Sequence, residues 1–130
     1  LDIEYSRGYL VFFGEVVFSR WQSPFISGDL DALAFSVEAR YKILPRLFVA
    51  ARYGRLDFSE IADTPDVDAD GKLTEPWEFP VWRLETGAGY YLSRHALLKT
   101  VWQINRTQEL SPGSNDPADN LVAVQMAVFY

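Results

Sequence analysis

Apolar and polar residues alternate one by one along most of this chain, and this period of two restricts its fold more than any other feature. From Leu33 to Ile43 every odd position is apolar or aromatic, whereas Glu38, Arg40 and Lys42 occupy even positions. The alternation returns in residues 47–54, 81–92, 98–105 and 122–129. Successive side chains of a β-strand point to opposite faces of a sheet, whereas a helix repeats about every 3.6 residues. The sequence therefore predicts an all-β chain of long strands with one apolar face.

Short and long connections between these strands alternate without exception. Tight turns are expected near Arg7 and Gly8, at 44–46 and at 93–95. Longer loops, each containing Pro and Gly, are expected at 22–31, 59–80 and 108–119. This order predicts an antiparallel up-and-down meander. Bacterial transmembrane β-barrels have the same asymmetry, with short turns at one rim and longer loops at the other.

Aromatic residues of the apolar face are expected near the strand ends. The residues assigned there are Phe18, Phe35, Tyr41, Phe58, Trp82, Tyr90 and Tyr130. The stretch 9–19 is apolar on both sides, and its even residues are assigned to the apolar face. Two aromatic girdles that flank an apolar band are typical of an outer-membrane barrel wall.

The opposite face carries charged and amide side chains, which we expect to line a water-filled lumen. A basic residue such as Arg40 in lipid near the midplane would cost about 2–4 kcal/mol, so these side chains should point inward. The expected pore-lining residues are Glu15, Glu38, Arg40, Lys42, Arg52, Arg83, Glu85, Lys99, Gln103, Asn105 and Gln125. Such a lumen favours anions slightly. The alternative is a lattice of ion pairs that satisfies a polar lumen without setting its selectivity.

The last residues of the chain resemble the C-terminal β-signal of bacterial outer-membrane proteins, which the barrel-assembly machinery recognises. The alternate positions that carry the resemblance are Val122, Val124, Met126, Val128 and Tyr130. In that family the final residue is most often Phe, whereas here it is Tyr, with Phe129 before it. The segments 38–46, 51–57 and 85–92 resemble the C-terminal part of a porin, and among porins they resemble the phosphate-selective type. The resemblance implies a Gram-negative outer-membrane protein, with lipid, the assembly machinery and small solutes as partners, and it leaves homo-oligomers open.

About six full strands and part of a seventh can be counted. The smallest single-chain transmembrane barrel has eight, and an open sheet would leave its edges unsatisfied in lipid. We therefore expect residues 1–130 to be the C-terminal portion of a single larger barrel domain, or to oligomerise; a truncated barrel is the simpler of the two.

An acidic segment in the second long loop resembles the first half of an EF-hand calcium loop. Asp66, Asp68 and Asp70 stand at alternate positions and Gly71 follows. Three carboxylates at this spacing can converge on one Ca²⁺, and Gly allows the sharp turn. Position twelve is Trp77 rather than the usual Glu. The expectation is a solvated acidic loop and no cofactor, with a calcium site as the alternative.

Composition excludes several other classes of protein. The net charge of -6 argues against nucleic-acid binding, which needs a basic face. The chain has no Cys, and its one His, His95, stands in an expected turn, so we expect no enzyme. The longest apolar run, 9–18, contains Gly14 and Glu15 and is far shorter than the ~20 residues of a transmembrane helix.

Three functions remain after these exclusions. The first is a porin-like barrel that lets small solutes diffuse across the outer membrane. The second is a structural or adhesive outer-membrane barrel that does not conduct. The third is a soluble periplasmic β-barrel that binds a small apolar ligand.

Overall fold

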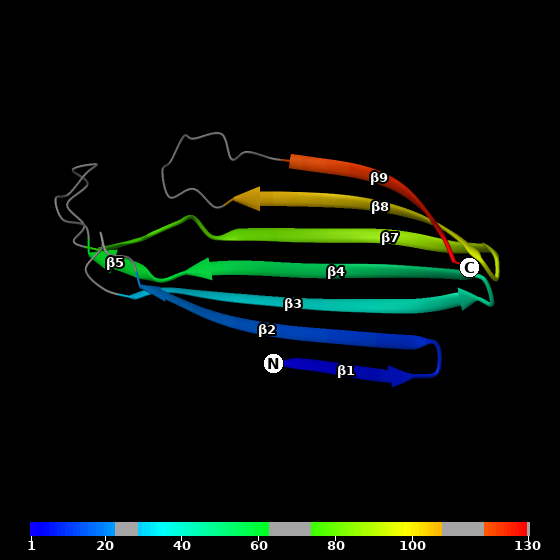
Figure 1. Ribbon diagram of the computed structural model, residues 1–130, viewed down its shortest axis with the longest axis horizontal. Coiled ribbons are helices and arrows are strands. Elements are labelled where there is room, and N and C mark those ends of the chain that lie inside the picture. Colours follow the sequence, from blue (N-terminus) through cyan, green and yellow to red (C-terminus); the bar gives the residue numbers. More distant parts are fainter. Residues whose placement is uncertain (23–28, 63–73, 108–118, 130) are drawn as a thin grey trace.

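The protein is all-β, and its main element is one open, antiparallel seven-stranded sheet (Figure 1). The computed structural model describes residues 1–22, 29–62, 74–107 and 119–129. The strands of the sheet are β1 (Asp2–Arg7), β2 (Leu10–Gln22), β3 (Asp29–Leu44), β4 (Leu47–Phe58), β7 (Val81–Ser93), β8 (Ala96–Thr107) and β9 (Asp119–Val128). Their spatial order is β1-β2-β3-β4-β7-β8-β9, so the predicted meander is confirmed.

The second long connection contains structure that the sequence did not predict. Strands β5 (Glu60–Ala62) and β6 (Thr74–Pro76) pair as a short antiparallel sheet of their own. The prediction of an unstructured loop over 59–80 is therefore wrong at both of its ends. Three-residue strands are too short for their periodicity to stand out from the surrounding sequence.

The three tight turns lie together at one end of the sheet, which we call the turn end; the opposite end is the loop end (Figure 1). Each turn has two residues between paired strands: Gly8 and Tyr9, Pro45 and Arg46, and Arg94 and His95. Gly8 has a φ of 62°, in the left-handed region that Gly enters without steric cost. The predicted short turns are confirmed to within a residue.

The strand register divides the side chains between two faces, because residues directly opposite one another on antiparallel strands point to the same face. One face, which we call the apolar face, carries Ile3, Tyr5, Leu10, Phe12, Gly14, Val16, Phe18, Leu33, Phe35, Val37, Ala39, Tyr41, Leu47, Val49, Ala51, Tyr53, Trp82, Leu84, Thr86, Ala88, Tyr90, Leu98, Thr100, Trp102, Ile104, Val122, Val124, Met126 and Val128. The other side is the polar face.

The register confirms the assignment of β2 and corrects one aromatic residue. Phe18 pairs with Leu33 and Leu10 with Tyr41, so the even residues of β2 lie on the apolar face as predicted. Phe58 pairs with Ala32 and lies on the polar face, so its assignment to the apolar girdle is wrong. The reason is parity: on β4 the odd positions belong to the apolar face, and Phe58 is even.

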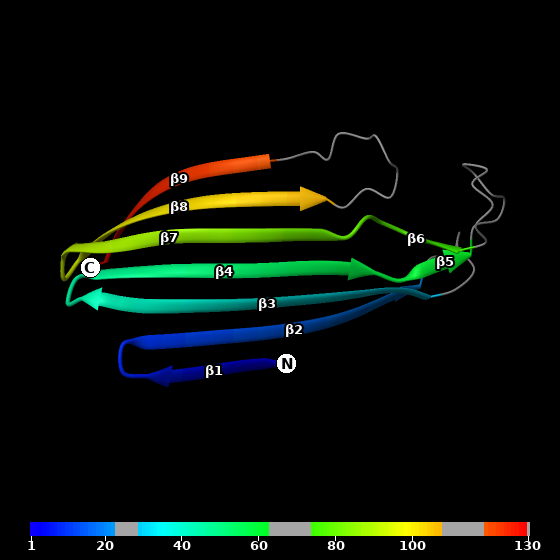
Figure 2. The same ribbon diagram turned by 180° about the vertical axis from the view of Figure 1, so that it is seen from behind.

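Neither face of the sheet is covered by a second layer of described residues, as the two opposite views in Figures 1 and 2 make visible. Among the described residues, Ala32 and Leu97 are the only buried hydrophobic side chains, each 4% exposed. Large apolar side chains remain accessible along every strand of the sheet. In the same part of the chain, no helix is long and apolar enough to cross a membrane. The described strands therefore do not enclose a core between two layers.

Candidate functional site

All eleven residues predicted to line a pore lie on the polar face. They form rows that run across the strands at the ~4.8 Å spacing of neighbouring strands. The central row places Glu38, Arg52, Glu85 and Gln103 directly opposite one another on β3, β4, β7 and β8. Acidic and basic side chains thus alternate across the middle of this face.

The next row toward the loop end is held by side-chain hydrogen bonds. It contains Glu15, Ser36, Gly54, Arg83 and Asn105. Arg83 Nε donates to Asn105 Oδ1 at 2.8 Å across β7 and β8. Gln103 Nε2 donates to the same Asn105 oxygen at 3.1 Å. These bonds fix the orientation of three of the predicted polar side chains.

The row nearest the turn end combines basic and aromatic side chains. Lys42 pairs with Phe48, Phe48 with Gly89, Gly89 with Lys99, and Lys99 with Gln125. The Arg40 guanidinium carbon lies 5.7 Å from the centroid of the Phe48 ring, within cation–π distance. The rings of Phe48 and Tyr91 lie 6.1 Å apart. Phe48 is therefore a contact point for both a cation and a second ring.

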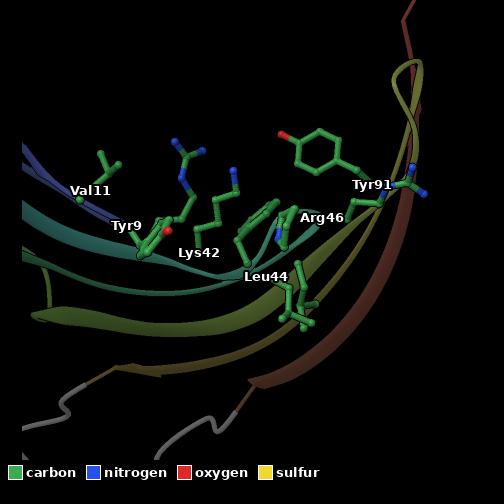
Figure 3. Close-up of a pocket in the computed structure, with 11 residues that line it drawn as sticks. Tyr9, Val11, Lys42, Leu44, Arg46 and Tyr91 are labelled. Atoms are coloured by element: carbon green, nitrogen blue, oxygen red, sulfur yellow. The ribbon is translucent and has the colours of Figure 1, made fainter.

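A hollow of about 440 Å³ opens on this part of the polar face. We call it the turn-end pocket; its lining includes Tyr9, Arg40, Lys42, Arg46, Phe48 and Tyr91. In Figure 3 the strands bend toward the side on which Lys42 and Tyr91 lie, whereas the Arg46 side chain points out past its turn. The alternation predicted Arg40, Lys42, Phe48 and Tyr91 on the same face, but it predicted neither the pocket nor the contact between Phe48 and Tyr91. The pattern of one strand does not reveal which residues of distant strands meet.

Within the described strands, the charged side chains of the apolar face lie near its ends, with Arg7 at the turn end and Arg55, Asp57 and Arg106 among those at the loop end. Its band runs from Leu10 to Phe18 on β2, which is about 26 Å at ~3.3 Å per residue. From Val122 to Val128 on β9 it spans about 20 Å. The four predicted assembly-signal residues of β9, Val122, Val124, Met126 and Val128, lie on this face and are between 58% and 74% exposed. Tyr130 lies outside the described residues.

Charged residues border the apolar face at the loop end. Arg20 Nε and Nη2 donate to the two carboxylate oxygens of Asp31 at 2.7 and 2.8 Å. Arg55 Nη2 donates to Asp57 Oδ1 at 2.6 Å on β4. Arg106 pairs with Trp82 across β7 and β8 on the same face. A bidentate Arg–carboxylate pair is the most specific geometry that an ion pair adopts.

An aromatic cluster lies at the loop end of the polar face. Trp77 packs against Phe58 with ring centroids 4.7 Å apart, and against Trp21 at 6.0 Å. The Trp77 indole N–H donates to the backbone oxygen of Asp31 at 3.4 Å, and the Ser59 backbone N–H donates to the same oxygen at 2.8 Å. From the sequence alone, Trp77 was not expected to pack against the sheet.

The predicted calcium ligands Asp66, Asp68 and Asp70 lie outside the described residues. Within the parts of the chain that the structure does describe, no group of three or more His, Cys, Asp or Glu side chains is close enough to hold a metal ion. The calcium site stays a prediction from the sequence.

Two surfaces are thus candidates for function: an uncovered apolar band with charged borders, and a polar face with a basic, aromatic pocket at its turn end. No model of a protein family matches this chain, and neither a curated protein nor a solved structure matches it.

Proposed function

We propose that the seven-stranded sheet forms part of the wall of a bacterial outer-membrane β-barrel, whose polar face lines a pore for small solutes. The observation that carries this proposal is the uncovered apolar face. Seven strands at ~4.8 Å spacing and a band of about 20–26 Å give roughly 700 Å² of apolar surface in plan. The largest apolar patch of a typical soluble monomer is about 300–600 Å². Such a face needs an apolar environment.

The dimensions of the apolar face support a bilayer as that environment. The outward apolar band of an outer-membrane barrel is about 25 Å tall. The bands on β2 and β9 come close to this height. Trp82 and Phe18 at the loop end, and Tyr41 and Tyr90 at the turn end, occupy the positions of interfacial aromatic girdles.

The curvature of the sheet favours this proposal over a soluble ligand-binding barrel. A soluble barrel turns its apolar side chains inward to fill a core or hold a ligand. Here the strands bend toward the side of Lys42 and Tyr91, which is the polar face (Figure 3). The apolar face is therefore on the outside of the curve.

The edges of the sheet place one requirement on the proposal. Strands β1 and β9 are the two edges, and both run toward the turn end. Pairing them with each other would make a parallel contact, whereas transmembrane barrels of this class are antiparallel throughout. Closure thus needs an odd number of further strands, from the same protein or from neighbouring subunits, to satisfy both edges in lipid.

Conductance separates a pore from a structural barrel. The full protein, extracted from outer membranes in detergent, is added to a planar lipid bilayer. A porin gives stable conductance steps, and an equal preparation heated to unfold the protein serves as the control. Membrane insertion without conductance would favour the structural or adhesive barrel. Recovery in the soluble periplasmic fraction would reject both membrane functions.

A further inference from the structure

Charge is unevenly distributed along the polar face. The rows nearest the turn end carry Arg40, Lys42, Arg46 and Lys99, with no acidic residue among the described positions. The acidic residues of the polar face in the described strands all lie nearer the loop end than Arg40: Asp2, Glu4, Glu15, Glu38, Glu85 and Asp119. The turn-end pocket is therefore a local region of positive potential.

Aromatic rings share the pocket with these cations. The backbone N–H of Lys42 donates to Tyr9 O at 2.9 Å, and that of Tyr91 donates to Arg46 O at 2.9 Å. These bonds continue the strand register, so Tyr9 stands beside Lys42 and Tyr91 beside Arg46 on the polar face. Tyr9 and Tyr91 are both exposed, so their rings are available to a ligand.

Phe48 forms the floor between these groups because Gly89 has no side chain. A Cβ on Gly89 would overlap the Phe48 ring. The ring can therefore lie over β7 and approach Tyr91, while the Arg40 guanidinium lies against it. The hollow of about 440 Å³ falls within the ~300–1,000 Å³ range of small-molecule sites.

We propose that the turn-end pocket binds a small organic anion that carries an aromatic ring, of which an aryl carboxylate is the simplest example. Lys42 binds the carboxylate by a charge-assisted hydrogen bond, and Tyr91 and Phe48 contact the ring. An inorganic anion would use the cations but leave the aromatic surfaces without a partner. This inference rests on the proposed function in one respect, namely that the polar face is in contact with water. It adds the chemical class of the solute that binds at the turn end.

Equilibrium binding of benzoate tests the site without requiring conduction. The full protein in detergent micelles is titrated with benzoate by calorimetry. Replacing Lys42→Gln removes the charged hydrogen-bond donor and should weaken binding about tenfold. Replacing Arg94→Gln makes the same charge change in the neighbouring turn, outside the pocket, and should leave the affinity unchanged. Phe48→Leu should weaken binding about threefold or more, since it removes the ring.

Two further ligands test the chemical class. Cyclohexanecarboxylate has the charge and size of benzoate without the π-face, and inorganic phosphate has the charge alone. Both should bind more weakly than benzoate. Equal affinity for cyclohexanecarboxylate, tighter binding of phosphate, or no response to Lys42→Gln would overturn the proposal. If Lys42→Gln does not give a folded, heat-modifiable protein, Lys42→Met takes its place with the same expectation.

The same preparations are also assayed for conductance, so that failure of the proposed binding site can be distinguished from failure of the proposed pore. A protein that conducts but does not bind benzoate rejects the site and keeps the pore. A protein that binds benzoate with these variant effects but does not conduct keeps the site and rejects the pore.

Discussion

Gly89 of β7 lies directly opposite Phe48 of β4, and its missing side chain leaves the space that the Phe48 ring occupies. Gly89→Ala should therefore destabilise the folded sheet by about 1–3 kcal/mol, the usual cost of overpacking. The measurement is the free energy of unfolding in urea, with the protein refolded into lipid vesicles.

Gly54→Ala is the matched control for this change. A Cβ at Gly54 would meet its nearest atom at 3.7 Å, an ordinary van der Waals contact. This substitution should be neutral or slightly stabilising, because Ala restricts the unfolded chain more than Gly. Equal destabilisation by both changes would mean that the contact between Phe48 and Gly89 does not matter.

A charge on the apolar face should be far more costly than the same charge on the polar face. Val124 and its neighbour Gln125 lie on opposite faces of β9, opposite Thr100 and Lys99. Val124→Lys should reduce stability in lipid by about 2–4 kcal/mol, the cost of Lys near the midplane of a barrel. Gln125→Lys should change it little. The readout is the fraction of heat-modifiable, folded protein on gels after refolding into vesicles, and similar losses for both variants would contradict the assignment of faces.

Ion selectivity should respond to the arginines of the polar face. Arg52 and Arg83 lie in its two central rows, so Arg52→Glu combined with Arg83→Glu should move the reversal potential of the pore toward cations. Arg7→Glu combined with Arg94→Glu changes the net charge equally at the turn end, outside that face, and should have a smaller effect. The reversal potential is measured across a salt gradient in planar bilayers. If it does not change when Arg52→Glu and Arg83→Glu are combined, these arginines lie away from the conducting path.

The long strands and their two faces could be predicted because the period of two is a local signal. In residues 33–43 the apolar or polar character of each side chain indicates the face of the sheet on which it lies. The strand register agrees with that assignment for every predicted polar-face residue. Pro45 and Gly8 likewise mark their turns through their own backbone preferences. These features need no knowledge of which strands meet.

Contacts between distant strands could not be predicted in the same way. The Phe48–Gly89 contact depends on how β4 and β7 align across a long connection, and a slip of one residue would separate the two. The packing of Trp77 on Phe58 depends on where that same connection returns to the sheet. Phe58 was assigned to the wrong face because its aromatic character at a strand end was given more weight than its even position.

The most direct test of a membrane-facing apolar surface uses two adjacent alanines of β4. Ala50 lies on the polar face and Ala51 on the apolar face. Because the chain has no Cys, Ala50→Cys and Ala51→Cys each introduce a single thiol that can carry a small fluorophore. The labelled proteins are reconstituted into vesicles that contain either ordinary phospholipid or phospholipid with brominated acyl chains.

Quenching by brominated lipid and by aqueous iodide then shows which of the two labels faces lipid and which faces water. Brominated lipid should quench the label at Ala51→Cys strongly and the label at Ala50→Cys weakly, and aqueous iodide should do the reverse. Quenching of neither label by brominated lipid, or of the label at Ala50→Cys more than that at Ala51→Cys, would contradict a barrel wall whose apolar face meets the bilayer.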